Sequence, residues 1–117
     1  MIKNVFFISI LGLSILFLQV CSIKLETGTV TGVVKDSITK NAVADVLVYA
    51  GKNYIPMTET STVTDSSGTY VLNSVPMDYN WIEADTTGYF GYNNMTIAKN
   101  ETIIVDIEIS TNLARPE

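Results

Sequence analysis

The chain has 117 residues, of which 47% are hydrophobic, and this length allows a single domain. Its formal net charge of −5 disfavours binding to nucleic acid or to anionic lipid headgroups, because like charges repel. The sequence contains no histidine, which excludes Ser-His-Asp triads, Cys-His dyads and histidine-bearing zinc peptidase sites.

The first 21 residues have the pattern of an export segment. Lys3 precedes an apolar run over residues 5–20, and no acidic residue occurs before Glu26. A short basic region followed by an apolar stretch of this length is typical of a signal peptide or of a hydrophobic anchor helix. Residues 1–21 are therefore not expected to form part of the folded domain. Their removal takes away Lys3 and no acidic residue, so the net charge moves from −5 to −6, as is typical of a soluble exported domain.

Cys21 decides how the exported chain is attached, and three outcomes are open. The sequence Leu18-Gln19-Val20-Cys21 resembles a bacterial lipobox, although Gln19 and Val20 depart from its usual small residues. Lipidation of Cys21 is favoured over cleavage by signal peptidase after Ser22 and over retention as an uncleaved anchor. Cys21 is the only cysteine, so no intrachain disulfide can form, and lipidation would consume a thiol that is otherwise a liability. All three outcomes place the folded part outside the cytoplasm, tethered at the cell envelope or secreted.

Residues 22–27 form a short tether, and short alternating runs separated by turn clusters follow it. Val, Ile, Thr and Tyr are abundant, and no sustained helical period occurs after residue 28. This pattern predicts an all-β fold, a single seven-stranded antiparallel β-sandwich over residues 28–110, followed by a tail over residues 111–117. The predicted strands cover residues 29–36, 43–50, 59–65, 69–75, 79–85, 92–98 and 102–109.

Alternation predicts which side chains face the core. Pro56 indicates an irregular segment or an edge strand, because proline cannot donate a ladder hydrogen bond. The predicted inward positions are Val30, Gly32, Val34, Val46, Val48, Ala50, Ile103, Val105, Ile107 and Ile109.

A hairpin is predicted in the middle of the chain. Asp65 opens the turn, Gly68 supplies a residue that can take a positive φ, and Tyr70 and Leu72 resume alternation on one face. The strand over residues 79–85 has two registers open to it. Because an unpaired buried Glu83 would cost several kcal/mol, we expect Ile82 and Ala84 inside, which leaves Trp81 facing outward.

Five segments in this order resemble carboxypeptidase regulatory-like domains, a family of prealbumin-like β-sandwiches. They are Thr31-Gly32-Val33-Val34-Lys35-Asp36, Ala42-Val43-Ala44-Asp45-Val46-Leu47-Val48, Thr64-Asp65-Ser66-Ser67-Gly68-Thr69-Tyr70, Val75-Pro76 and Gly88-Tyr89.

The resemblance implies an immunoglobulin-like or prealbumin-like sandwich with no catalytic residues and no cofactor, in an exported bacterial protein. Gly32 would let the facing sheet approach, and Gly88 would permit a tight bend before Tyr89, expected as a core anchor. Asp78 stands where the family often has glycine, so the loop after Pro76 departs from the pattern.

Carboxylates supply two weaker site hypotheses. Asp78, Glu83 and Asp85 could pair for glycoside cleavage, but a sandwich of this size has little room for a substrate cleft. Asp36, Asp65, Asp78 and Asp85 could supply oxygen ligands to calcium, but their spacing matches no defined calcium loop. We therefore predict neither an enzyme nor a metal site.

Aromatic residues near loops are the better binding candidates, since their rings can stack on sugars or dock a protein. Trp81 and Tyr92 are the predicted ligand contacts; Tyr54, Tyr89 and Phe90 are further candidates. The predicted function is that of a non-enzymatic envelope module with a structural or protein-interaction role. The alternative is a carbohydrate-binding module. The partner is accordingly an envelope protein or a glycan, with the membrane reached through the N-terminus.

Overall fold

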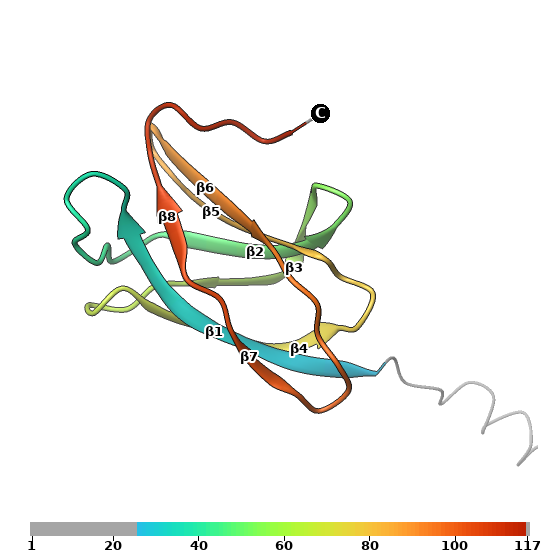
Figure 1. The fold of residues 1–117 in the computed structure, drawn as a ribbon. Helices are drawn as coiled ribbons and strands as arrows, with labels where there is room; N and C mark the ends of the chain where they lie inside the picture. Colours follow the sequence, from blue (N-terminus) through green and yellow to red (C-terminus); the bar gives the residue numbers. More distant parts are fainter. Residues whose placement is uncertain (1–25, 117) are drawn as a thin grey trace, which may run out of the picture.

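A computed structural model of the chain describes residues 26–116 (Figure 1). The predicted export segment, the lipidation site Cys21 and most of the tether lie outside the described residues. Within residues 26–116 no helix is long and apolar enough to cross a membrane. The regular elements of this part are eight strands: β1 (Thr27–Asp36), β2 (Leu47–Lys52), β3 (Ile55–Val63), β4 (Thr69–Pro76), β5 (Trp81–Thr86), β6 (Tyr89–Asn94), β7 (Thr102–Ile104) and β8 (Ile107–Ile109).

The strands form two packed sheets, so the prediction of an all-β sandwich is confirmed (Figure 1). In the first sheet β1 lies between β4 and β7, and β8 also pairs with β1; the second sheet has the order β3-β2-β5-β6. β1 is antiparallel to β4 but parallel to β7 and β8. The expectation of a purely antiparallel fold is therefore wrong for the last strands. After β6 the chain crosses from the second sheet to the first, and it enters at the beginning of β1, in the same direction.

The predicted strand over residues 102–109 is divided into β7 and β8, which is why there are eight strands and not seven. Val105 and Asp106 lie at the break. The Asp106 carboxylate accepts a hydrogen bond from the backbone N–H of Val33 at 2.9 Å, in place of a backbone carbonyl. The Val105 carbonyl accepts the hydroxyl of Tyr70 and lies against Gly32, where a Cβ would be 1.9 Å from the carbonyl oxygen. The break interrupts the ladder without a change of register, because Val30 pairs with Ile103 before it and Val34 with Ile107 after it. Gly32 leaves room there for another backbone.

The core lies between the sheets and contains the predicted inward residues of β1, β2 and the last strands. Ile82 and Ala84 are both fully buried in it, so the chosen register of β5 is confirmed. Tyr70 and Leu72 also belong to the core. The buried core residues are Val30, Val34, Val46, Val48, Ala50, Tyr70, Leu72, Val75, Ile82, Ala84, Met95, Ile97, Ile107 and Ile109.

The bounds of several strands differ from the prediction: β2 begins at Leu47 and not at residue 43, and β5 begins at Trp81 and not at residue 79. The bounds of β3 and β6 differ as well. β3 begins at Ile55 and includes Pro56. Proline is tolerated there because β3 is an edge strand, which has a hydrogen-bonded neighbour on one side only. β6 begins and ends earlier than predicted, yet Met95 and Ile97 after its end are still buried. Apolar alternation therefore marked burial correctly in a segment that does not pair as a strand.

One edge of the sandwich is joined across the two sheets. The N–H of Phe90 donates to the carbonyl of Ser110 at 3.0 Å, and the N–H of Ser110 donates back to Phe90 at 3.0 Å. This bridge links β6 to the residue after β8 and fixes the start of the C-terminal tail.

The molecule has two poles, separated by the length of β1 (Figure 1). At the proximal pole, where β1 begins, Thr29 bonds to Glu101 and Met77 bonds to Glu26. At the distal pole, where β1 ends, lie the segments 37–46, 64–68, 87–88 and 110–113. Since β1 has ten residues and a strand rises roughly 3.3 Å per residue, the poles are roughly 30 Å apart.

Candidate binding surface on the outer face of the second sheet

The outer face of the second sheet carries a compact set of aromatic and charged side chains. Because alternation puts Ile82 and Ala84 in the core, it puts Trp81 and Glu83 of β5 on the opposite face. Phe90 and Tyr92 of β6 share that face, since Tyr92 is the register partner of Glu83. We call the following set the outer-face cluster: Tyr54, Trp81, Glu83, Phe90, Tyr92 and Arg115.

Trp81 is at the centre of the cluster and is only 1% exposed. Tyr92 stacks on it with ring centroids 4.4 Å apart and an interplanar angle of 24°. Tyr54 meets it edge-on at 5.0 Å and 82°. The expectation that Trp81 is exposed on the surface is therefore wrong, although it faces away from the core as predicted. Tyr92, the other predicted ligand contact, is half-buried with one ring face against Trp81, so a sugar could stack on Trp81 only after displacing a tyrosine.

Tyr54 reaches Trp81 from a strained turn. Asn53 and Tyr54 connect β2 to β3, with φ values of 53° and 69°. A two-residue turn of this kind requires positive φ at both positions and usually has glycine at the second. A bulky residue there costs about 1–2 kcal/mol of backbone energy. Tyr54 offsets this cost by its aromatic contact with Trp81, which a glycine could not make.

Glu83 is buried within the cluster, with 1% of its side chain exposed. It was expected in solvent because an unpaired buried carboxylate is costly. The structure corrects this expectation, because Glu83 is fully paired. The indole Nε1 of Trp81 donates to its Oε1 at 2.9 Å. Arg115 donates from Nε to Oε1 at 3.0 Å and from Nη2 to Oε2 at 2.6 Å.

Arg115 closes the cluster from the C-terminal tail. Its guanidinium lies 5.5 Å from the centroid of the Phe90 ring, within the range of a cation–π contact. The hydrogen bond to Glu83 raises the pKa of Arg115, and the negative charges of Glu83 and Asp85 add to the effect. Sequence reasoning missed this residue. A single arginine in a polar tail gives no signal of a partner that lies 32 positions earlier in the chain.

The tail itself has few other attachments. Among the described residues, none from 111 to 116 makes a backbone–backbone hydrogen bond, and residues 111–115 are exposed. The Arg115 side chain is 41% exposed even though its partner is covered. The arginine fork is therefore the main polar contact that holds the tail on the sheet.

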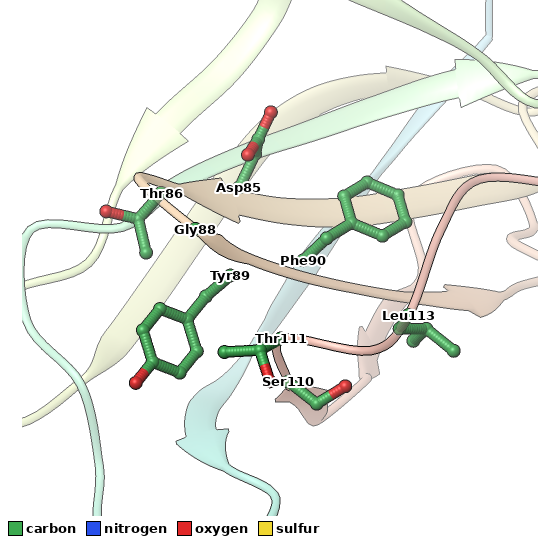
Figure 2. A pocket seen from close by; sticks show the side chains of 8 residues that line it. All are labelled: Asp85, Thr86, Gly88, Tyr89, Phe90, Ser110, Thr111 and Leu113. Atoms are coloured by element: carbon green, nitrogen blue, oxygen red, sulfur yellow. The ribbon is translucent and has the colours of Figure 1, made fainter.

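Tyr89 lies apart from the cluster. It is 39% exposed, so the expectation that it anchors the core is wrong. Tyr89 and Phe90 point to opposite sides of β6 (Figure 2), and of the two only Phe90 contacts the outer-face cluster. Tyr89 is the first residue of β6 and lies at the rim of the core, in a hollow lined also by Val43 and Ile109. Gly88 precedes it in the β5–β6 turn with a φ of 78°. The shallow hollow of Figure 2 lies beside this turn and is lined by Asp85, Thr86, Gly88, Tyr89, Phe90, Ser110, Thr111 and Leu113.

Three of the four aspartates considered as calcium ligands, Asp65, Asp36 and Asp78, have separate partners within the domain. The Asp65 carboxylate accepts the hydroxyl of Ser67 at 2.8 Å and the N–H groups of Ser67 and Thr69 at 2.9 and 3.0 Å; the Ser67 hydroxyl is the largest cause of its lowered pKa. Gly68 completes this turn with a φ of 76°.

Asp36 accepts the N–H groups of Thr39 and Ile38, which lower its pKa. Asp78 pairs with Lys52 at 3.2 Å. Within residues 26–116 there is no group of three acidic, histidine or cysteine side chains that could hold a metal ion.

Two packed sheets, a first strand inserted between β4 and the parallel β7, and a mid-chain Asp–Gly hairpin define a prealbumin-like β-sandwich domain. Residues 29–110 match the carboxypeptidase regulatory-like domain family. The chain therefore belongs to that family. A comparison with curated proteins gave no match.

A similar solved structure is that of a variant of BcpA, the major pilin subunit of Bacillus cereus. The two share 16% sequence identity with a TM-score of 0.53, and the match covers 72% of this chain and 30% of the pilin chain. At this level of identity the likeness concerns the fold.

Proposed function

We propose that the chain is a non-enzymatic β-sandwich module that works at the cell envelope, where it has a structural or protein-interaction role. It is exported by its N-terminal segment and remains tethered there, with lipidation of Cys21 as the favoured attachment. The proposal is supported by membership of the carboxypeptidase regulatory-like family, by a fold shared with a pilin subunit and by a sequence without histidine.

The observation that carries the proposal is the placement of the two poles. Thr27, the first residue of β1, is at the proximal pole, and any tether that precedes it must join the domain there. The loops of the distal pole lie at the other end of β1 (Figure 1). A module attached at its proximal pole would present the distal loops to the surroundings, as loops on a rigid sandwich commonly do in recognition.

The first test concerns location and attachment. Cells that make the full chain are labelled with a radioactive fatty acid and then fractionated, with Cys21→Ala as the matched control. We expect label in the envelope fraction for the original chain and none for Cys21→Ala. Recovery of the intact chain in the cytosol would contradict the proposal.

The second test concerns the presenting pole. A photo-crosslinking amino acid replaces exposed Thr87 at the distal pole, and in the control it replaces Met77 at the proximal pole, which is 39% exposed. We expect a discrete protein adduct from position 87 in intact cells and none from position 77. Equal crosslinking at both positions would argue against distal presentation. Saccharide binding on a glycan array that is lost in Tyr92→Ala would favour the carbohydrate-binding alternative.

A further inference from the structure

We infer that the outer-face cluster is a guanidinium-specific binding site, which Arg115 of the chain's own tail fills here, and that it can accept an arginine side chain from an extended segment of a partner protein. This site is separate from the distal loops, and the inference holds whether or not those loops bind anything.

The Glu83 carboxylate matches a guanidinium group. Both carboxylate oxygens receive a hydrogen bond from Arg115, one from Nε and one from Nη2. Arginine forms this two-pronged contact because its donors lie in one plane, whereas the ammonium group of lysine is a single point charge. The Phe90 ring beside the guanidinium favours the same flat cation. The geometry therefore selects arginine over lysine.

The receiving side of the site is held in place by groups other than the tail. The Trp81 indole N–H fixes Oε1 of Glu83, and Tyr92 and Tyr54 hold the indole ring on two sides. Tyr54 does so from a backbone conformation that a tyrosine rarely adopts. Strained and tightly supported side chains around one carboxylate are typical of a preorganised site.

The site combines a buried carboxylate with a position on the outer face of the sheet. Glu83 is almost fully covered although it faces away from the core, and the covering residue is itself 41% exposed. A buried ion pair is a poor means of stabilising a fold, since apolar residues of similar volume do as well or better. What the buried Glu83 contributes is selectivity for the cationic group that pairs with it. Asp85, whose charge also acts on Arg115, adds to the attraction for a cation.

The Arg115 side chain that now fills the site can be exchanged for another arginine. Without backbone hydrogen bonds from residues 111 to 116, the tail can lift from the sheet when the arginine fork opens. Because only four residues lie between Ser110 and Arg115, the tail competes at an effective concentration on the order of millimolar. A partner arginine therefore binds the unaltered chain weakly and binds a chain lacking Arg115 much more tightly.

The test uses the full chain with Arg115→Ala and the probe peptide acetyl-Leu-Ala-Arg-Pro-amide. A second peptide has lysine in place of arginine. Trp81 is the only tryptophan, so its fluorescence reports on the cluster directly. We expect a saturable fluorescence change with the arginine peptide, with affinity about tenfold or more above that of the lysine peptide. The unaltered chain should bind the arginine peptide at least about tenfold more weakly than the Arg115→Ala chain does.

The control variant combines Arg115→Ala with Glu83→Gln, which removes the charge and keeps the shape of the side chain. It should not bind either peptide. Equal affinity for the two peptides, or binding retained in the double variant, would overturn the inference. If circular dichroism shows that Arg115→Ala does not fold, Arg115→Lys replaces it, because lysine keeps the positive charge but not the fork. The arginine peptide must then displace the lysine tail, and failure to do so at millimolar concentration would equally overturn the inference.

Discussion

Gly32 provides the most direct test of the way the first sheet is assembled. A Cβ added at this position would lie 1.9 Å from the Val105 carbonyl oxygen, 2.6 Å from the Val105 carbonyl carbon and 3.1 Å from the Tyr70 ring. Normal contacts between carbon and oxygen are above 3 Å, so Gly32→Ala requires a backbone displacement of about 1 Å or more. The displaced segment is the break between β7 and β8, where the Val105 carbonyl accepts the Tyr70 hydroxyl.

The cost can be bounded from these contacts. Overpacking a core costs typically about 1–3 kcal/mol, and here the obstacle is a backbone that cannot rotate away as a side chain can. Loss of the hydrogen bond between Tyr70 and Val105 adds about 1 kcal/mol. We therefore expect Gly32→Ala to lower the free energy of unfolding by about 3 kcal/mol. For a domain of this size each kcal/mol lowers Tm by roughly 4–8 °C, so the fall in Tm is roughly 12–24 °C.

Thermal unfolding followed by circular dichroism measures this change, with urea unfolding to give the free energy. The matched control is Gly88→Asn, because nothing lies within 4 Å of a Cβ at Gly88 and asparagine tolerates its positive φ. We expect the control to unfold within a few degrees of the original chain. A Gly32→Ala chain as stable as the control would show that β1 and the break between β7 and β8 are not packed as described.

Three further perturbations have defined outcomes. Burial raises the pKa of Tyr70 above its ordinary value of 10, with the charge of Asp106 as a lesser cause. The unfolded chain therefore ionises first as pH rises, and stability should fall above about pH 10; Tyr70→Phe should show a smaller fall in an alkaline series of urea titrations, and an unchanged fall would contradict this. Hydrogen bonds from Ser67 and Thr69 hold the pKa of Asp65 below its ordinary value of 3.8, so its stabilising contribution is present above that pH and is lost as pH falls through the lower, folded-state pKa. Asp65→Asn should flatten this part of the acid unfolding curve, whereas a curve identical to that of the original chain would refute the turn's role. Tyr54→Gly relieves about 1 kcal/mol of backbone strain but loses an aromatic contact worth about 0.5–1.5 kcal/mol; Tm should change little while the fluorescence of Trp81 shifts to the red, and an unshifted spectrum would show that Tyr54 does not cover the indole.

The features that could be predicted from the sequence are those set by neighbours along the chain. Alternation identified the inward faces of β1 and β2 and the choice of Ile82 and Ala84 over their neighbours. The Asp65 and Gly68 hairpin was predictable because an aspartate carboxylate bonds to N–H groups two and four residues ahead. These patterns depend on interactions within a few residues, where the chain's own chemistry decides the conformation.

The candidate site was only half predictable. Trp81 and Tyr92 were predicted as contacts because they are aromatic residues near loops. Alternation predicts the face of a sheet on which a side chain lies, but it does not predict which residues cover that face. Trp81 was expected to be exposed and is buried by Tyr54 and Tyr92. Tyr89 was expected in the core and is 39% exposed, because it is the first residue of β6 and lies at the rim of the core, in a hollow lined also by Val43 and Ile109.

By itself, the sequence determined the class of fold, the family and the local turns, since each follows from residue pattern over short distances. The tertiary structure alone decided the parallel docking of β7 and β8 on β1, the break between them at Val105, and the pairing of Glu83 with Arg115. The physical reason is that each of these joins segments far apart in the chain. Burying Glu83 without a partner would destabilise the fold. The cost is offset only because Arg115, a tail residue 32 positions away, supplies the matching charge.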